Sequence, residues 1–141
     1  KQDMPMDKRS ERARLFRVLH VPGDPVILFN VWDAGSALAV AEAGAKALAT
    51  GSWSVAAAHG HFDAEGLPID LAIANAAQIA ASTLLPVTLD FEGGYAVDPV
   101  ALAANFARAM ATGVIGWNFE DRIVGGEGLH PIKLQAKRIG A

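Results

Sequence analysis

The sequence contains no cysteine, and this absence excludes disulfide bonds, thiolate metal sites and a cysteine nucleophile or general acid. It also contains no apolar stretch near the roughly 20 residues that cross a bilayer. Its charged start has no apolar region of the kind found in signal peptides. We therefore expect a cytoplasmic protein that does not bind membranes.

Basic residues are scarce after position 18. Residues 1–18 hold six Lys and Arg against three Asp and Glu, and the remainder carries a net charge of −6. Because no stripe of basic and aromatic residues follows, we do not expect nucleic-acid binding. The basic start instead predicts a solvated amphipathic helix, with Leu15, Phe16 and Leu19 facing inward.

Apolar residues are abundant and make up 52% of the 141 positions. They form four short runs that predict strands near 26–32, 46–52, 86–90 and 114–119. Continuous apolar runs indicate strands that are buried on both faces, as in a parallel sheet.

Helix signals separate these runs. We expect Ser36 to cap a helix over 37–43, and Asp70 to cap a helix that runs to position 83. Asp98 is followed by proline, a pattern typical of a helix start. Pro131 opens a last predicted helix, which runs to position 139.

The alternation of strands and helices predicts right-handed crossovers and a parallel sheet whose strands lie in sequence order. Four β-α units are half of a (β/α)₈ TIM barrel, which typically needs about 250 residues. An isolated half barrel would leave two strand edges unpaired, which is a liability. We therefore interpret residues 1–141 as a single α/β domain that forms the N-terminal part of a TIM barrel. A small open sheet of four strands is the alternative.

Acidic residues follow the predicted strands. In parallel α/β folds the C-terminal ends of the strands meet at one face, where chemistry is placed. Such a cluster is costly unless a cation neutralises it, and a hard divalent ion with oxygen ligands is the simplest answer. The carboxylates that this placement gathers at one mouth are Asp33, Asp63, Asp90, Glu92, Glu120 and Asp121.

The most informative local motif is Asp-Phe-Glu-Gly-Gly-Tyr at 90–95. In an extended chain Asp90 and Glu92 point to the same side, so both can bind one cation. The two glycines allow tight backbone geometry and the close approach of a ligand. A polar loop with glycines for a turn is the simpler alternative.

Other acidic positions have two interpretations as well. Glu120 can face the mouth while Asp121 turns to a backbone donor or to Arg122, or the two acids can form an ordinary surface pair. For Asp33 we favour a role at the start of the next helix over a contact with substrate.

Three loop segments remain open. The turn Thr-Gly-Ser-Trp-Ser at 50–54 leaves backbone N–H groups free to hold an anion, or is a simple strand-to-helix turn. His59 and His61 could bind zinc but lack a third well-placed ligand, so we interpret both as loop residues. The glycine-rich segment 122–130 is either a mobile active-site lid or a flexible loop.

Taken together, these segments resemble the isocitrate lyase/phosphoenolpyruvate mutase superfamily from position 30 to 139. The resemblance runs through Asn-Val-Trp-Asp-Ala-Gly-Ser-Ala at 30–37, Glu-Ala-Gly at 42–44 and Gly-Ser at 51–52. It continues through the motif at 90–95 and ends with Gly-Trp-Asn-Phe-Glu-Asp at 116–121. That superfamily forms (β/α)₈ barrels, often tetramers with a swapped terminal helix. Its members bind Mg²⁺ and cleave or form C–C or P–C bonds in α-oxo-carboxylate or phosphonate substrates.

The resemblance implies a ligand set for Mg²⁺, with Mn²⁺ as an alternative. Asp90 is the implied direct ligand, and Glu92, Glu120 and Asp63 often act through water. The implied substrate-binding residues are Trp32, Asp33, Gly51, Ser52 and Trp53. The candidate catalytic residues are Asp63, Glu120 and Arg122.

The chain departs from two branches of this superfamily. The lyase branch carries a Lys-Lys-Cys-Gly-His type loop, the mutase branch carries a Lys-Thr-Asn-Ser type loop, and segment 122–130 reproduces neither. The chain therefore most resembles poorly characterised bacterial members. We predict a Mg²⁺-dependent, lyase-like enzyme that acts on a small 2-oxo acid through an enolate, as a homodimer or homotetramer. The alternatives are a phosphonopyruvate hydrolase or mutase, and a non-catalytic protein that binds oxo acids.

Overall fold

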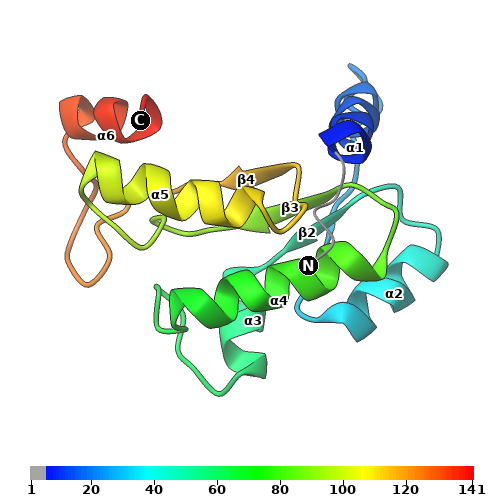
Figure 1. Ribbon diagram of the computed structural model, residues 1–141, viewed down its shortest axis with the longest axis horizontal. Coiled ribbons are helices and arrows are strands. Elements are labelled where there is room, and N and C mark those ends of the chain that lie inside the picture. Colours follow the sequence, from blue (N-terminus) through cyan, green and yellow to red (C-terminus); the bar gives the residue numbers. More distant parts are fainter. Residues whose placement is uncertain (1–5) are drawn as a thin grey trace.

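The computed structural model describes residues 6–141, which form one parallel sheet with helices between its strands (Figure 1). The four strands are hydrogen-bonded neighbours in the order β1-β2-β3-β4, and every pair is parallel. The predicted sequential parallel sheet is therefore confirmed. The elements are α1 (Met6–Val18), β1 (Phe29–Val31), α2 (Ala34–Glu42), β2 (Leu48–Thr50), α3 (Ser52–Ala58), α4 (Ile69–Ser82), β3 (Val87–Asp90), α5 (Pro99–Met110), β4 (Gly116–Asn118) and α6 (Ile132–Ile139).

The register of the strands aligns their C-terminal ends. Val31 at the end of β1 pairs with Thr50 at the end of β2, and Asp90 at the end of β3 pairs with Asn118 at the end of β4. The segments that leave the four strands therefore start along one edge of the sheet. We call this edge, where Val31, Thr50, Asp90 and Asn118 end their strands, the site edge.

Two of the predicted helix caps are wrong by a few positions. Asp33, not Ser36, is the N-cap of α2, because its carboxylate accepts from the Ser36 N–H while the Ser36 hydroxyl contacts the Asp33 backbone. This reciprocal arrangement is a capping box, which satisfies two free helix N–H groups. Pro68, not Asp70, precedes α4, and Asp70 lies in its first turn, where a negative charge favours the helix dipole. Asp98 caps α5 as predicted.

A seven-residue helix, α3, lies where only a turn was expected. It begins immediately after β2, and its N-cap Gly51 offers no side chain to cap it. A segment of seven residues is too short to show a clear helical periodicity of apolar positions. Buried Val55 and Ala56 pack it against Leu67, so tertiary contacts stabilise this helix.

The main core lies between the sheet and the helices that cover it. Buried Leu48, Val87 and Leu89 from the strands pack with Ile79 of α4. An aromatic group continues this core toward the site edge, with the Phe106 ring 5.1 Å from Phe91. The centroid of the Phe106 ring also lies 4.9 Å from that of Trp117 and 5.0 Å from that of Phe119.

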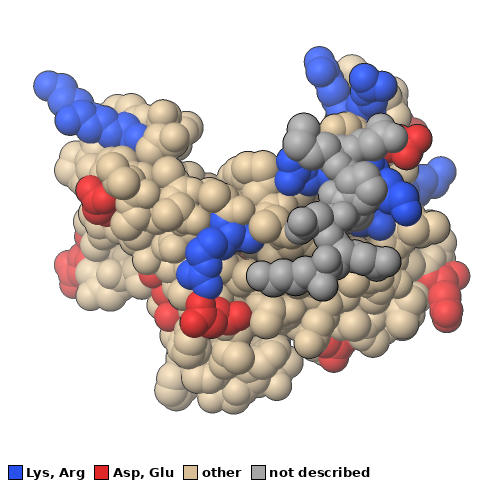
Figure 2. All heavy atoms as spheres, in the orientation of Figure 1, with Lys and Arg blue, Asp and Glu red and all other residues tan. Residues whose placement is uncertain are grey.

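The first helix is held by arginines more than by an apolar face. Leu15 is 44% exposed, so its predicted inward position is wrong, whereas Phe16 and Leu19 are partly buried. Arg12 donates to the carbonyls of Ala80 and Thr83 at the end of α4. Figure 2 shows basic side chains gathered over α1. Within residues 6–141, no helix is both long and apolar enough to span a bilayer.

Candidate active site

Asp90 is held at the centre of the site edge by the end of β2 and the start of α3. Its Oδ2 accepts from the Ser52 N–H at 2.9 Å, and its own N–H donates to Thr50 Oγ1 at 2.9 Å. The first bond places the carboxylate at the start of α3, where the helix dipole favours negative charge. The segment 50–54 could have left its backbone N–H groups free to hold an anion. For Ser52 this interpretation is wrong, because its N–H binds Asp90.

Glu92 is a buried acid, only 6% exposed. Its Oε2 accepts from the Glu65 N–H at 2.7 Å. Burial raises the pKa of Glu92 to about 7, the bond from Glu65 opposes this shift, and the charges of Asp63, Glu65 and Asp90 add to it. A carboxyl group with such a pKa can accept or release a proton near neutral pH.

Glu65 is a site residue that the sequence did not reveal. Its Oε1 accepts from the Tyr95 N–H at 2.8 Å, while its own N–H binds Glu92. The two acids thus join loop 59–68 to the motif at 90–95. An acid two positions after Asp63 was visible in the sequence, but no local pattern indicates that it folds onto a loop 30 positions away.

The backbone is strained at Glu65, at Glu92 and at nearby Tyr95. Glu65, Glu92 and Tyr95 have positive φ angles of 59°, 50° and 59°. A left-handed conformation costs a non-glycine residue roughly 1–2 kcal/mol. Strain of this kind persists only where the surroundings hold it, and it gathers at functional sites.

Glu120 and Asp63 complete the set of neighbouring acids. Both residues are exposed, but the Glu120 N–H donates to the Glu92 carbonyl at 2.8 Å. Partial desolvation first and then the charge of Asp90 raise the pKa of Glu120, while Arg122 lowers it. The charge of Asp63 raises the pKa of both Glu120 and Glu92. The predicted metal ligands therefore share one electrostatic field.

This donor set suits a hard divalent cation. Burial is the main cause of the raised pKa values of Glu92 and Glu120, and the charges of neighbouring acids add to it. A bound cation relieves both effects, because it favours the charged form of a carboxyl group. Among residues 6–141, however, no three His, Asp or Glu side chains gather as a ready-made metal cage. Asp90 and Glu92 each give one oxygen to a backbone N–H. Mg²⁺ usually takes only one or two carboxylates and keeps several waters, so the residues fit such an ion. The ligand identities stay a prediction.

The predicted substrate-binding residues lie along the same edge. Trp32 is 44% exposed and Trp53 is 69% exposed, so both rings face outward. Gly51 is buried, and a Cβ there would lie 2.8 Å from Asn30 Nδ2, which explains the need for glycine. Asp33 serves as the cap of α2, and the bond from the Ser36 N–H lowers its pKa. A contact of these residues with substrate stays a prediction.

The segment 122–130 is folded as a hairpin. Arg122 and Leu129 form an antiparallel bridge, and the His130 N–H donates to the Asp121 carbonyl at 2.8 Å. Arg122 is exposed, and its role in catalysis stays a prediction, as does the mobility of this segment. His59 lies at the end of α3, where its Nδ1 is 2.9 Å from the Val55 carbonyl.

Comparisons with known proteins find relatives in sequence and in fold. The sequence model of the phosphoenolpyruvate phosphomutase family matches residues 16–141. An uncharacterized protein of Mycobacterium tuberculosis is 37% identical over 106 residues, which cover 75% of this chain and 40% of that protein. A crystal structure of a Burkholderia cenocepacia J2315 protein, provisionally named a phosphonomutase, is 48% identical with a TM-score of 0.89. The match covers 92% of this chain and 52% of that one.

A further solved structure carries a small-molecule product. It is oxaloacetate acetylhydrolase in complex with oxalate, 26% identical with a TM-score of 0.79. The match covers 90% of this chain and 46% of that one. The chain thus spans about half the length of the proteins that it matches.

Proposed function

Because the chain belongs to the phosphoenolpyruvate phosphomutase family, within the superfamily that its sequence resembles, we propose that it is part of a Mg²⁺-dependent lyase-like enzyme. Its substrate is a small 2-oxo acid, in which a C–C or P–C bond is cleaved or formed through an enolate. The observation that carries this proposal is the site edge itself. There a buried acid with a pKa of about 7, Glu92, lies in the field of Asp63, Glu65 and Asp90.

In this proposal Asp90 holds Mg²⁺ or Mn²⁺ directly, and Glu92, Glu120 and Asp63 contact it through water. The ion supplies Lewis-acid stabilisation of negative charge on the 2-oxo and carboxylate oxygens. Asp90 suits the direct role because the bond from Ser52 occupies only its Oδ2. The raised pKa values of Glu92 and Glu120 support their roles, since a bound cation would offset the burial and the like charges that raise them.

The other residues of the edge orient the substrate and move its proton. We assign the substrate carboxylate to the start of α3, near Gly51 and Trp53 and beside Ser52, whose own N–H already binds Asp90. Asp63, Glu120 and Arg122 are the candidates for holding or transferring the proton. Trp32 and Asp33 line the neighbouring end of β1.

Two alternatives draw on specific observations. The 48% identity to a protein provisionally named a phosphonomutase favours a phosphonopyruvate hydrolase or mutase as the second candidate. The absence of both known lid motifs from segment 122–130 favours a non-catalytic protein that binds oxo acids. We further propose a cytoplasmic homodimer or homotetramer in which residues 1–141 form the N-terminal part of one TIM-barrel domain.

A panel of 2-oxo acids and phosphonates, assayed on the full-length protein with Mg²⁺ and with EDTA, tests this function. We expect turnover of a 2-oxo acid that EDTA abolishes and that Asp90→Asn reduces by at least about tenfold. Asn retains an acceptor for the Ser52 N–H, so the turn should keep its shape. Turnover that is indifferent to EDTA would contradict the metal-dependent mechanism. Metal-dependent binding of oxalate without any turnover would favour the non-catalytic alternative.

A further inference from the structure

The backbone of residues 93–96, which follows Glu92, forms hydrogen bonds with two charged side chains, one from each side. On one side the Glu65 carboxylate accepts from the Tyr95 N–H at 2.8 Å. On the other side Arg138 of α6 donates through Nη2 to the carbonyls of Gly93 at 2.6 Å and Ala96 at 3.2 Å. The two side chains come from segments before and after this loop, and neither belongs to the predicted ligand set.

Arg138 is a buried cation, only 3% exposed. Its Nε is also buried and has no hydrogen-bond partner within residues 6–141. Burial of a charge with an unpaired polar atom opposes folding, so stability alone does not explain this position. The guanidinium carbon lies 4.9 Å from the centroid of the Phe119 ring, which directly precedes Glu120. Arg138 therefore contacts two of the segments that carry predicted metal ligands, the segment after Glu92 and the segment before Glu120.

Helix α6 reinforces this link. Arg138 Nη1 donates to Gln135 Oε1 at 2.5 Å, and Gln135 Nε2 lies 3.5 Å from the Glu120 carbonyl. One turn of α6 thus spans the distance from the glycine loop to the end of β4.

The loop between the two charges needs external support. Glu92 and Tyr95 flank the two glycines with left-handed backbones, which non-glycine residues keep only when their surroundings hold them. Glu65 packs directly on this backbone, because a Cβ at Gly93 would lie 2.8 Å from Glu65 Oε1. The bonds from Glu65 and Arg138 therefore hold the backbone directly next to the strained residue Glu92.

We propose that Glu65 and Arg138 are positioning residues that clamp backbone 93–96 and so present Glu92 to the cation and the oxo acid. They act through the loop and touch neither ligand. The proposal rests on the proposed function of the site edge, but the clamp has a signature that needs no metal. Loss of either side chain should loosen residues 93–96 in the metal-free protein.

The test uses the full-length protein with Glu65→Ala, Glu65→Gln, Arg138→Met and Arg138→Lys. Two quantities are measured: the Mn²⁺ affinity, from electron paramagnetic resonance of the free ion, and hydrogen exchange of the peptide over 91–97 without metal. We expect Glu65→Ala and Arg138→Met to weaken Mn²⁺ binding by about 10- to 100-fold and to speed that exchange. Glu65→Gln keeps the acceptor and Arg138→Lys keeps a donor, so both should restore much of the affinity.

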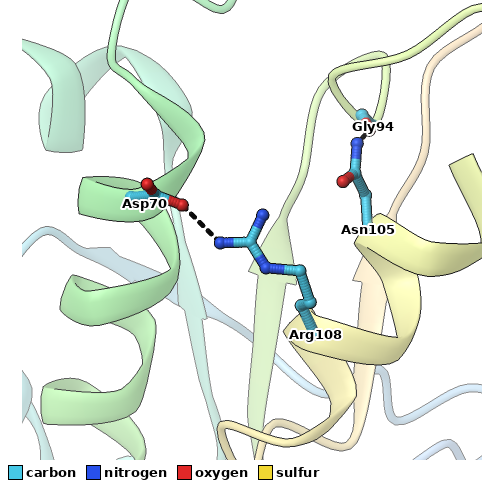
Figure 3. Close-up of polar contacts among 4 residues, drawn as sticks. All are labelled: Asp70, Gly94, Asn105 and Arg108. Atoms are coloured by element: carbon cyan, nitrogen blue, oxygen red, sulfur yellow. Dashed lines mark hydrogen bonds and ion pairs between the residues drawn. The ribbon is translucent and has the colours of Figure 1, made fainter. Parts of the chain in front are cut away.

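Arg108→Met is the matched control. Arg108 is also a long cation on a helix, but it pairs with Asp70 of α4 and not with the loop (Figure 3). Figure 3 also shows Asn105, one turn earlier on α5, donating to the Gly94 carbonyl, so this helix contacts the loop through another residue. Arg108→Met should change neither the Mn²⁺ affinity nor the exchange over 91–97.

Each outcome bears on the clamp. A folded Glu65→Ala protein with unchanged Mn²⁺ affinity and unchanged exchange overturns it, even if the melting temperature falls. If Arg138→Met does not fold, Glu65→Ala and Arg138→Lys decide. If the parent protein binds no Mn²⁺, the proposed function fails, and the exchange over 91–97 alone decides whether the clamp exists.

Discussion

Glu92 shows how a single residue acquires its chemistry from its surroundings. Its carboxyl group is buried beside three other acids, and one backbone N–H from Glu65 is the contact that offsets this cost. The same carboxyl group on a solvated loop would have an ordinary pKa. The proton affinity of Glu92 is therefore a property of the folded site edge.

This shift predicts how the stability of the metal-free protein depends on pH. The pKa of Glu92 rises from 4.5 to about 7 on folding, so the folded state holds this proton more tightly. The resulting stabilisation is complete below the lower pKa and is lost as the pH rises through the higher one. In EDTA, Glu92→Gln should therefore gain stability relative to the parent over this range, by at most about 3 kcal/mol.

Urea unfolding at about pH 5 and about pH 8 measures this gain. Glu127→Gln, which also removes one carboxyl group but at an exposed position, is the matched control. Saturating Mg²⁺ should reverse the sign for Glu92, because a bound cation favours the carboxylate. A constant difference between Glu92→Gln and the parent at both pH values in EDTA would contradict the shift.

At the scale of elements, the loop after β3 depends on its packing against α5. Gly94 has a φ of +78°, and a Cβ there would lie only 2.4 Å from Leu102 Cδ1 of α5. Gly125 in the hairpin 122–130 has a similar φ of +72° but open space around it. Substitutions at these two positions therefore distinguish the cost of a left-handed backbone, which both carry, from the cost of a steric clash, which only Gly94 carries.

We predict that Gly94→Ala destabilises the protein more than Gly125→Ala does. Both substitutions carry the left-handed penalty of roughly 1–2 kcal/mol. Only Gly94→Ala also forces a buried contact, which typically adds about 1–3 kcal/mol. Urea unfolding of both variants measures the difference, and equal destabilisation would show that Leu102 moves aside without cost.

At the scale of the whole molecule, the outer strands β1 and β4 each have one hydrogen-bonded neighbour among residues 6–141. Phe29 on β1 is 56% exposed, and Ile27 just before it is 69% exposed. An open strand edge with apolar side chains is a template for association with another chain. A barrel that closes on these edges would remove the hazard.

We therefore expect residues 1–141, studied as a separate polypeptide, to self-associate in a concentration-dependent way. Phe29→Lys should weaken this association, because a charge on an edge strand opposes pairing. Lys46→Glu, at an exposed position outside the strands, is the control for a change of charge. Light scattering over a concentration series measures the effect, and a monomer at all concentrations would contradict it.

The sequence by itself determined the order and type of most elements. Apolar runs, prolines and capping residues are local signals, and they predicted four parallel strands in sequence order. They also placed the start of α5 at Asp98. The same signals missed α3, because a short helix is stabilised by packing more than by its own pattern. They misplaced the cap of α2 because either Asp33 or Ser36 can accept a helix N–H, and only the backbone angles choose between them.

The sequence also indicated that acids would follow the strands, and it named Asp90, Glu92 and Glu120 on that basis. Only the tertiary structure decided how those acids are held. Glu65 lies 30 positions from Tyr95, and Arg138 lies 45 positions from Gly93, so no local pattern could join them. The raised pKa of Glu92 has the same origin, because burial and the charges of neighbouring loops exist only once the chain has folded.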